Sequence, residues 1–460
     1  MRKKKKATAF RYVDLFAGCG GFSLGLESSG GDLVFALERS PMAAETFMRN
    51  LIKPQASDLD WENHLSLSTS NQVDQGLVIA DIENAFSNAQ LRRVLRGEEI
   101  DLIVGGPPCQ GFSLAGRRDP RDKRNSLAWN YLDYVQLGRP KFVIIENVLG
   151  MNAKFGKGKA EENSIFSQLA VALEETGSKY VVQKLQLNAR HYGAAQNRER
   201  LFLVACRKDV AKRLGVSSNN LLWKSDFKDN VSTLPDLAPL PTEHSESQLS
   251  VRDAIGDLHK GGKKSKYVEN LQDSAFWGLA PSRVLENNNP RTHNPRSTLK
   301  FELYLAIKRL KLSPLLMRSG LSDVENDSRN LELERVEKMQ IFPILGSSGQ
   351  VLASNFSSLV STLKEHTTRK HSQRVLEISK TPPTVITSPD DYIHPLAPRV
   401  LTVRELARFQ GFCDDFVFYS KETTGGLKRR TEVPQYSQVG NAVSPFVSRA
   451  LGMRIRDLVK

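Results

Sequence analysis

The sequence predicts an α/β fold, in which a doubly wound, mostly parallel sheet of the Rossmann-like type is joined to a second, smaller domain. Three observations lead to this prediction. Short runs rich in β-branched and aromatic residues alternate with stretches of helical pattern from residue 10 to about residue 206. The first run enters a glycine-rich turn at residues 17–21. Polar or reactive side chains follow the ends of several later runs, where parallel sheets bind their ligands.

The predicted elements follow one another along this first part of the chain. Strands are expected at residues 11–16, 33–37, 77–80, 101–104, 142–145, 180–187 and 201–206. Helices are expected at residues 42–50, 90–96, 127–137 and 165–175, and a further helix opens at Phe22. Near the end of the chain, helical patterning returns at residues 404–410 and 444–458.

The stretch from about residue 207 to residue 395 is rich in Pro, Ser, Asn and Gly and lacks this alternation. We therefore expect the sheet domain at residues 10–235, a second domain at residues 236–394, and a segment at residues 395–460 that returns to the sheet domain. Residues 260–380 hold 20 Lys and Arg against 12 Asp and Glu, more than half of the net charge of +14. Such an excess is typical of a surface that contacts a polyanion such as nucleic acid.

Composition excludes several classes of protein. With 40% hydrophobic residues, a chain of 460 residues can form proper cores. Its apolar runs are too short to cross a bilayer, so we expect a cytoplasmic protein with no membrane partner. The four cysteines lie far apart and the eight histidines are scattered, so neither a disulfide framework nor a metal site is expected.

A pocket for an adenosyl ligand is predicted at the first two strand ends. Gly18, Gly20 and Gly21 form a turn in which a ligand can approach the backbone. Glu38 follows Gly18 by twenty residues, the position from which an acidic residue meets ribose hydroxyls in this architecture. Ser23 stands where a dinucleotide fingerprint requires its third glycine, so a ligand without a pyrophosphate fits better.

Two more side chains belong to this pocket in the same interpretation. Asp81, after the third strand, would hydrogen-bond an adenine amino group, and Phe16 would pack against the ring. The alternatives are a helix N-cap for Asp81 and a core aromatic for Phe16.

A reactive cysteine is predicted in the loop after the fourth strand. Cys109 follows two glycines and two prolines, which make a rigid exposed loop at the ligand-binding edge of the sheet. The alternative is a buried, inert thiol, which describes Cys206 in its apolar strand better than Cys109.

Charged residues near the fifth and last strands complete the predicted site. Glu146 ends an apolar strand, so partial burial would raise its pKa and allow it to share a proton with a base. Arg198 and Arg200 precede the last strand and suit a pyrimidine carbonyl or a phosphate. A surface glutamate and exposed surface arginines are the alternatives.

Taken together, these segments resemble the DNA (cytosine-5) methyltransferases of the bacterial restriction-modification type. The resemblance rests on Pro-Pro-Cys-Gln-Gly-Phe-Ser at residues 107–113 and Glu-Asn-Val at residues 146–148. Six blocks occur in the family's order, at residues 14–21, 105–113, 146–148, 196–200, 404–412 and 440–443. A chance match to all six is negligible. The likeness covers about residues 11–206 and 398–455, and the middle region resembles the family's target-recognition domain.

The resemblance implies a reaction and roles for matched residues. Cys109 would attack carbon 6 of a cytosine flipped out of double-stranded DNA, Glu146 would engage ring nitrogen 3 and the exocyclic amine, and Arg198 would hold the carbonyl oxygen. S-adenosyl-L-methionine would supply the methyl group. The remaining matched positions are Arg200 for catalysis; Phe16, Gly18, Gly20, Gly21, Glu38, Asp81, Pro108, Asn441 and Val443 for the cofactor; and Gln110, Ser113 and Gln196 for DNA.

The sequence departs from the family pattern at two places, and two alternative functions remain. Cys413 stands where proline usually follows the fifth block, and the middle region gives no target sequence. The rivals are a transfer RNA cytosine-5 methyltransferase, whose middle region tends to be short, and an inactive DNA-binding relative. Further expectations are a monomer, association with the nucleoid, and a cognate restriction endonuclease that acts on the same site.

Overall fold

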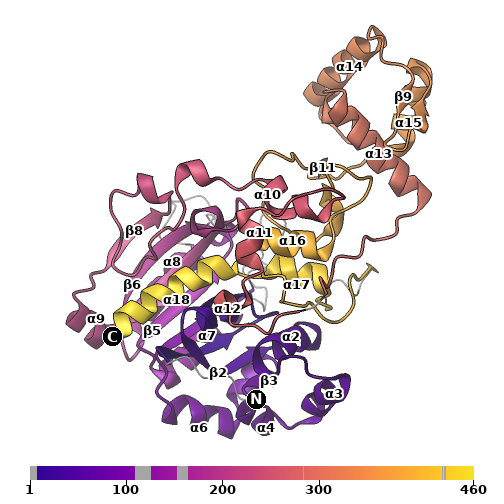
Figure 1. Ribbon diagram of the computed structural model, residues 1–460. Helices are drawn as coiled ribbons and strands as arrows, with labels where there is room; N and C mark the ends of the chain where they lie inside the picture. The colour runs from indigo at the N-terminus through magenta and orange to yellow at the C-terminus, as the bar shows by residue number, and fades with distance from the viewer. Residues whose placement is uncertain (1–7, 109–125, 153–163, 283, 427, 429–430) are drawn as a thin grey trace.

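A computed structural model describes residues 8–108, 126–152, 164–282, 284–426, 428 and 431–460. Its centre is an eight-stranded sheet of order β3-β2-β1-β4-β5-β7-β6-β8 (Figure 1). In this sheet β7 is antiparallel to both neighbours and the other pairs are parallel, which confirms the predicted mostly parallel α/β fold. The strands are β1 Phe10–Leu15, β2 Gly31–Glu38, β3 Leu77–Ile79, β4 Leu102–Gly105, β5 Phe142–Asn147, β6 Tyr180–Asn188, β7 Glu199–Arg207 and β8 Asn219–Lys224.

Both faces of the sheet are buried, which explains the continuous apolar runs in its central strands, such as residues 102–104 and 142–145. On β5, Val143 and Ile145 join one hydrophobic cluster, whereas Phe142 and Ile144 join another on the opposite face. The first cluster lies under α5 Ile82–Phe86, α6 Ala89–Gly97, α7 Ser126–Gly138 and α8 Ile165–Glu175. The second lies under α1 Gly21–Ser28, α9 Lys208–Leu214 and the C-terminal helix α18 Pro445–Val459.

The C-terminal helix α18 packs closely on α1. A side chain at Gly25 would place its Cβ 2.4 Å from the carbonyl oxygen of Pro445, and the same addition at Gly452 would lie 2.1 Å from Ser29 Oγ. Glycine at both positions therefore lets the two helix backbones approach each other. The chain's last helix thus covers its first strands (Figure 1).

An insertion between β2 and β3 contains α2 Pro41–Phe47, a π-helical turn at Met48–Ile52, α3 Asp58–Ser66 and α4 Thr69–Asp74. The predicted helix at residues 42–50 therefore extends through two kinds of helix. Among the described residues, no helix is both long and apolar enough to cross a membrane.

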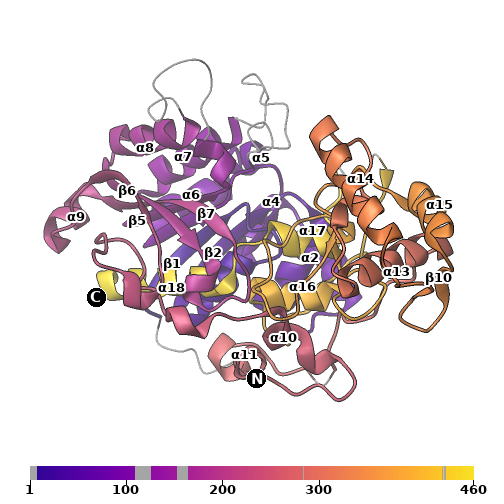
Figure 2. The ribbon, with the colours of Figure 1, turned by 90° about the horizontal axis from the view of Figure 1, so that it is seen from above.

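The middle region is helical, contrary to the irregular pattern in its sequence. Helices α13 Pro295–Arg309, α14 Asp323–Glu337 and α15 Phe356–His366, with the short strands β9 Ile344–Leu345 and β10 Val351–Ala353, form a lobe that projects from the body (Figures 1 and 2). This lobe has its own hydrophobic cluster between Phe301 and Val400. The strands β11 Arg374–Val375 and β12 Tyr392–Ile393 pair where the chain returns to the body.

The segment before the lobe belongs to the body. Helices α10 Val251–Ile255, α11 Lys266–Leu271 and α12 Ser274–Trp277 share one hydrophobic cluster with α16 Val403–Gln410 and α17 Gln435–Asn441. The predicted domain limits at residues 236 and 394 stay predictions, and this shared cluster favours a lobe that begins later in the chain.

Candidate active site

The loops that carry the predicted site lie side by side because their strands are neighbours in register. Leu15 of β1 pairs with Gly105 of β4, and Gly105 pairs with Ile145 of β5. All three strands are parallel, so their carboxyl ends meet at one edge of the sheet. The loop that leads toward Cys109 therefore lies between the glycine-rich loop and Glu146, as the sequence predicts.

The glycine-rich loop has the backbone geometry of a ligand cradle. Phe16, Gly18 and Gly20 all have positive φ angles, of 59°, 56° and 99°. Phe16 is partly exposed, and a Cβ added to Gly18 would meet nothing within 4 Å. Open space therefore lies directly in front of this backbone.

Glu38 closes one side of the cradle. Its carboxylate accepts hydrogen bonds from the backbone N–H groups of Gly18, at 2.9 Å, and Ser40, at 2.7 Å. Burial raises the pKa of Glu38, and these two amides oppose that rise. Asp81 follows β3, the neighbour of β2; its exposed carboxylate lies 3.7 Å from Arg39 Nη1 and makes no N-cap hydrogen bond to α5.

Asp14, which was not among the predicted site residues, anchors this loop from below. It is 1% exposed and accepts a hydrogen bond of 2.6 Å from the Ser23 hydroxyl. Burial raises the pKa of Asp14 to about 7, a rise that the hydrogen bond from Ser23 opposes. An aspartate at an inward-facing position of a central strand was the available sequence signal.

The block at residues 440–443 lies beside the glycine-rich loop. A Cβ on Gly21 would lie 2.5 Å from the carbonyl oxygen of Val443, so only glycine fits here without a shift of the backbone. Val443 is partly buried, and Asn441 is exposed at the end of α17. Two predicted cofactor-binding positions from the end of the chain thus come next to those from its beginning.

Glu146 is buried beside the cysteine-bearing loop. The residue is 9% exposed, and its Oε1 lies 3.2 Å from Arg200 Nε. Its Oε2 lies 3.0 Å from the position that a Cβ would take on Gly106, so the absence of a side chain there leaves room beside the carboxylate. Burial raises the pKa of Glu146, whereas Arg200 and Arg198 lower it.

The loop toward Cys109 is held at its root by Asn147. The Asn147 amide donates a hydrogen bond of 3.0 Å to the carbonyl oxygen of Pro107. Pro108 is half-buried. The predicted nucleophile Cys109 and the predicted DNA contacts Gln110 and Ser113 lie outside the described residues.

The two arginines have different surroundings. Arg198 is 3% exposed and donates to three backbone carbonyls, those of Val385 at 2.9 Å, Gly440 at 2.9 Å and Ala442 at 3.1 Å. Arg200 is the arginine that forms the ion pair with Glu146. Burial lowers the pKa of both guanidinium groups.

Gln196, for which a DNA contact is expected, is buried in the structure. Its side chain is 0% exposed; it accepts a hydrogen bond of 2.9 Å from Val385 N–H and donates to Gln410 and to the carbonyl of Phe409. Gln196 therefore joins the returning chain to α16, and a polar residue at a strand end gave no sign of that burial.

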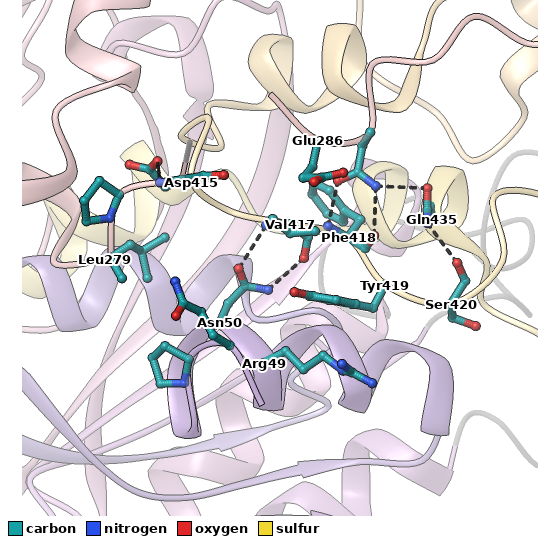
Figure 3. A pocket seen from close by; sticks show the side chains of 16 residues that line it. Arg49, Asn50, Leu279, Glu286, Asp415, Val417, Phe418, Tyr419, Ser420 and Gln435 are labelled. Atoms are coloured by element: carbon teal, nitrogen blue, oxygen red, sulfur yellow. Dashed lines mark hydrogen bonds between the residues drawn. The ribbon is translucent and has the colours of Figure 1, made fainter. Parts of the chain in front are cut away.

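Two cavities lie near these elements. The smaller, of about 370 Å³, is lined by Arg200, Thr384 and residues 148–150, so it opens beside the pair of Glu146 and Arg200. The larger, of about 720 Å³, lies between residues 49–55, 279–287 and 415–420 (Figure 3). Of the predicted catalytic and cofactor-binding residues that the structure describes, none lines the larger cavity. Its walls are fixed by Asn50 and Asn287, which pair with the backbone of Val417 and Phe418.

The sheet order and the polar residues at its strand ends define a doubly wound α/β protein with a candidate ligand site at the carboxyl edge of the sheet. The family model of the C-5 cytosine-specific DNA methylases matches residues 10–457, so the chain belongs to this family and is a DNA cytosine-5 methyltransferase. The family identified from the sequence motifs is therefore confirmed.

Relatives and one solved structure agree with this assignment. The chain is 28% identical to the Type II methyltransferase M.DdeI of Desulfomicrobium norvegicum over 444 residues, 96% of this chain and 88% of the relative. It is 27% identical to the Type II methyltransferase M.XorII of Xanthomonas oryzae pv. oryzae over 450 residues, 97% of this chain and 85% of that relative. The structure of a putative DNA modification methyltransferase from an E. coli prophage matches with a TM-score of 0.51 and 21% identity, covering 98% and 99% of the two chains, which supports the fold.

Proposed function

We propose that this enzyme transfers the methyl group of S-adenosylmethionine to carbon 5 of a cytosine flipped out of a short, specific duplex sequence, through a covalent adduct with Cys109. The observation that supports this most directly is the buried Glu146, in a strand next to the one that leads to Cys109. Flipping is required because carbons 5 and 6 are stacked inside a duplex.

The glycine-rich cradle suits S-adenosylmethionine. The family and its fold imply this cofactor, and the open space at Gly18 leaves room for it. We propose that Glu38 takes the ribose hydroxyls, Asp81 the adenine amino group and Phe16 a face of the ring. Pro108, Asn441 and Val443, with Gly20 and Gly21, would complete the cofactor contacts. The bound cofactor supplies an electrophilic methyl group.

Glu146 and Cys109 would act at opposite positions of the cytosine ring, Glu146 at nitrogen 3 and Cys109 at carbon 6. The Cys109 thiolate forms a bond to carbon 6, and the electron pair displaced into the ring is stabilised as nitrogen 3 takes a proton from Glu146. Burial raises the pKa of Glu146 and so favours the protonated form that this step needs. Carbon 5 would then bond to the methyl group as the bond from that methyl to the cofactor's sulfur breaks, which leaves the cofactor as the thioether S-adenosylhomocysteine. A base, expected to be water, removes the carbon-5 proton, the proton on nitrogen 3 returns to Glu146, and the thiolate leaves as the double bond between carbons 5 and 6 re-forms.

The contacts of Arg198 and Arg200 favour different roles for the two residues. Arg198 is predicted to hold the cytosine carbonyl, but its guanidinium already donates to three backbone carbonyls. Arg200 lies against Glu146 and lines the adjoining cavity. We therefore propose that Arg200 holds the carbonyl oxygen and that Arg198 positions the backbone around the site.

A role in a restriction-modification system is supported by relatives named Type II methyltransferases. In that role the enzyme would act as a monomer, associate with the nucleoid and protect DNA from a cognate endonuclease that cuts the same sequence.

The test is incorporation of labelled methyl from S-adenosylmethionine into duplex DNA and, in parallel, into transfer RNA, followed by nucleoside analysis. We expect label in 5-methylcytosine from DNA and none from RNA. Label in RNA alone, or cofactor binding with no transfer to any DNA sequence, would contradict the proposal.

A further inference from the structure

One basic loop of the projecting lobe lies near the candidate active site. Residues 367–374 contain Arg369, Lys370 and Arg374 and no acidic residue. The loop ends in β11, which pairs in parallel with β12, so that Arg374 lies opposite Tyr392. β11 lies where the lobe meets the body (Figure 1).

A continuous series of contacts joins this loop to the catalytic carboxylate. The Arg374 guanidinium lies over the Tyr392 ring, 5.6 Å from its centroid. The Tyr392 hydroxyl donates a hydrogen bond of 2.7 Å to the carbonyl oxygen of Thr384. Thr384 and Arg200 line the same cavity, and Arg200 pairs with Glu146. Arg374 itself is exposed, and these contacts tie it to the candidate site.

The backbone of the loop is fixed by a neighbouring turn. Thr368 N–H donates to the Met317 carbonyl at 2.9 Å and Ser319 N–H donates to the Thr368 carbonyl at 3.0 Å. The Arg318 side chain holds the His371 carbonyl at 3.1 Å. A rigid support of this kind lets a side chain reach a ligand at little cost in conformational entropy.

The basic side chains of the loop differ in whether they already have ion-pair or hydrogen-bond partners. Lys370 lies 3.5 Å from both Asp390 and Asp391, so its charge is partly neutralised. Arg369 is exposed and packs over Gly320, 3.9 Å from the position of a Cβ there. Within the part of the chain that the structure describes, Arg369 has neither a hydrogen-bond nor an ion-pair partner.

We propose that Arg369 and Arg374 bind the substrate duplex, with Arg374 on a backbone phosphate beside the flipped cytosine and Arg369 on a guanine edge in the major groove. The inference rests on the proposed function in that the substrate is duplex DNA. A flipped base stays attached to its strand, so the phosphates next to it must pass close to the reaction site, to which Arg374 is joined through Tyr392 and Thr384. Arg369 carries a free planar fork, and such a fork matches the two acceptors of guanine.

The proposed roles of Arg369 and Arg374 are tested by different measurements. Wild type, Arg369→Ala and Arg374→Ala would each methylate a random-sequence duplex library, which is then read by bisulfite sequencing. Arg369→Ala is expected to lose about 5- to 150-fold of the discrimination at one base pair of the site. An unchanged sequence preference would overturn the assignment of Arg369.

Binding to duplex DNA at several salt concentrations tests Arg374 without methyl transfer, so this arm stands even if the proposed chemistry fails. Arg374→Ala is expected to weaken binding to all sequences alike and to reduce the salt slope by about 1. The matched control is Arg213→Ala, which removes the same charge from α9, far from the lobe in both views (Figures 1 and 2). A salt slope for Arg374→Ala equal to that of the control would overturn the phosphate contact.

Discussion

Replacing Asp14 with asparagine is expected to change how the stability of the enzyme depends on pH. Burial raises the pKa of this carboxyl from its ordinary value of 3.8 to about 7. The folded state therefore holds a proton that the unfolded state releases over this range. The stability that this proton gives is fully present below pH 3.8 and is lost as pH rises through 7.

The size of the effect follows from the distance between the two pKa values. One pH unit corresponds to about 1.4 kcal/mol for one proton, so the loss is about 3 kcal/mol between pH 5 and pH 8. Asparagine has nearly the same shape as aspartate, can accept the hydrogen bond from the Ser23 hydroxyl and does not titrate. The free energy of unfolding of Asp14→Asn, relative to that of wild type, should therefore be about 3 kcal/mol higher at pH 8 than at pH 5.

Urea unfolding of both proteins, followed by circular dichroism at pH 5 and pH 8, measures this difference. Any cost of the new amide donor is independent of pH and cancels in the comparison. Asp327→Asn on the exposed surface of α14 is the control for removing one carboxylate. If the difference between Asp14→Asn and wild type were the same at both pH values, the reasoning about the buried carboxyl would be refuted.

Four further predictions concern the site. Cys109→Ser should reduce methyl transfer to background while duplex binding persists, and a parallel loss of binding in a mobility-shift assay would contradict the nucleophile assignment. Glu38→Ala should weaken S-adenosylmethionine binding by about 10- to 150-fold with DNA affinity unchanged, whereas equal losses in two calorimetric titrations would rule this out. Gly21→Ala should cost about 1–3 kcal/mol of stability and weaken cofactor binding, because the new Cβ meets the Val443 carbonyl; unaltered thermal unfolding would count against it. Arg198→Lys should cost about 3 kcal/mol or more, since an ammonium cannot reach all three carbonyls, and wild-type stability in urea would show that they are dispensable.

The sheet could be predicted closely because each central strand is a short apolar run between turn signals. The predicted strands at residues 142–145 and 180–187 correspond to β5 and β6, and the predicted helix at residues 165–175 coincides with α8. The strand β8 was missed. It forms one edge of the sheet, and its Leu221 is 77% exposed, so burial imposes little apolar pattern on it.

The helices of the lobe could not be recognised by their periodicity. On α13, buried residues run almost without a break from Phe301 to Ile307, so no single apolar face repeats. On α14, Val336 is buried and Leu333 is partly buried, and the other residues are polar or exposed. A search for one apolar stripe fails in both cases, for opposite reasons.

The site was predictable where chemistry follows directly from position on a strand. Glu146 and Glu38 are strand-end carboxylates, and parallel strands bring such ends together. The buried positions of Gln196 and Arg198 depend on how residues about 190 to 240 positions later fold back beside β7, and local sequence carries no information on that return.

Arg198 shows what this return achieves. Its guanidinium is buried and donates to backbone carbonyls at Val385, on the path back from the lobe, and at Gly440 and Ala442. The next carbonyl, that of Val443, lies against Gly21 in the glycine-rich loop. A buried cation needs such oxygen partners, since leaving it without them would cost several kcal/mol. The residues from 385 onward therefore do more than cover the sheet, because their carbonyls stabilise the charge that holds Arg198, the returning chain and the glycine-rich loop together.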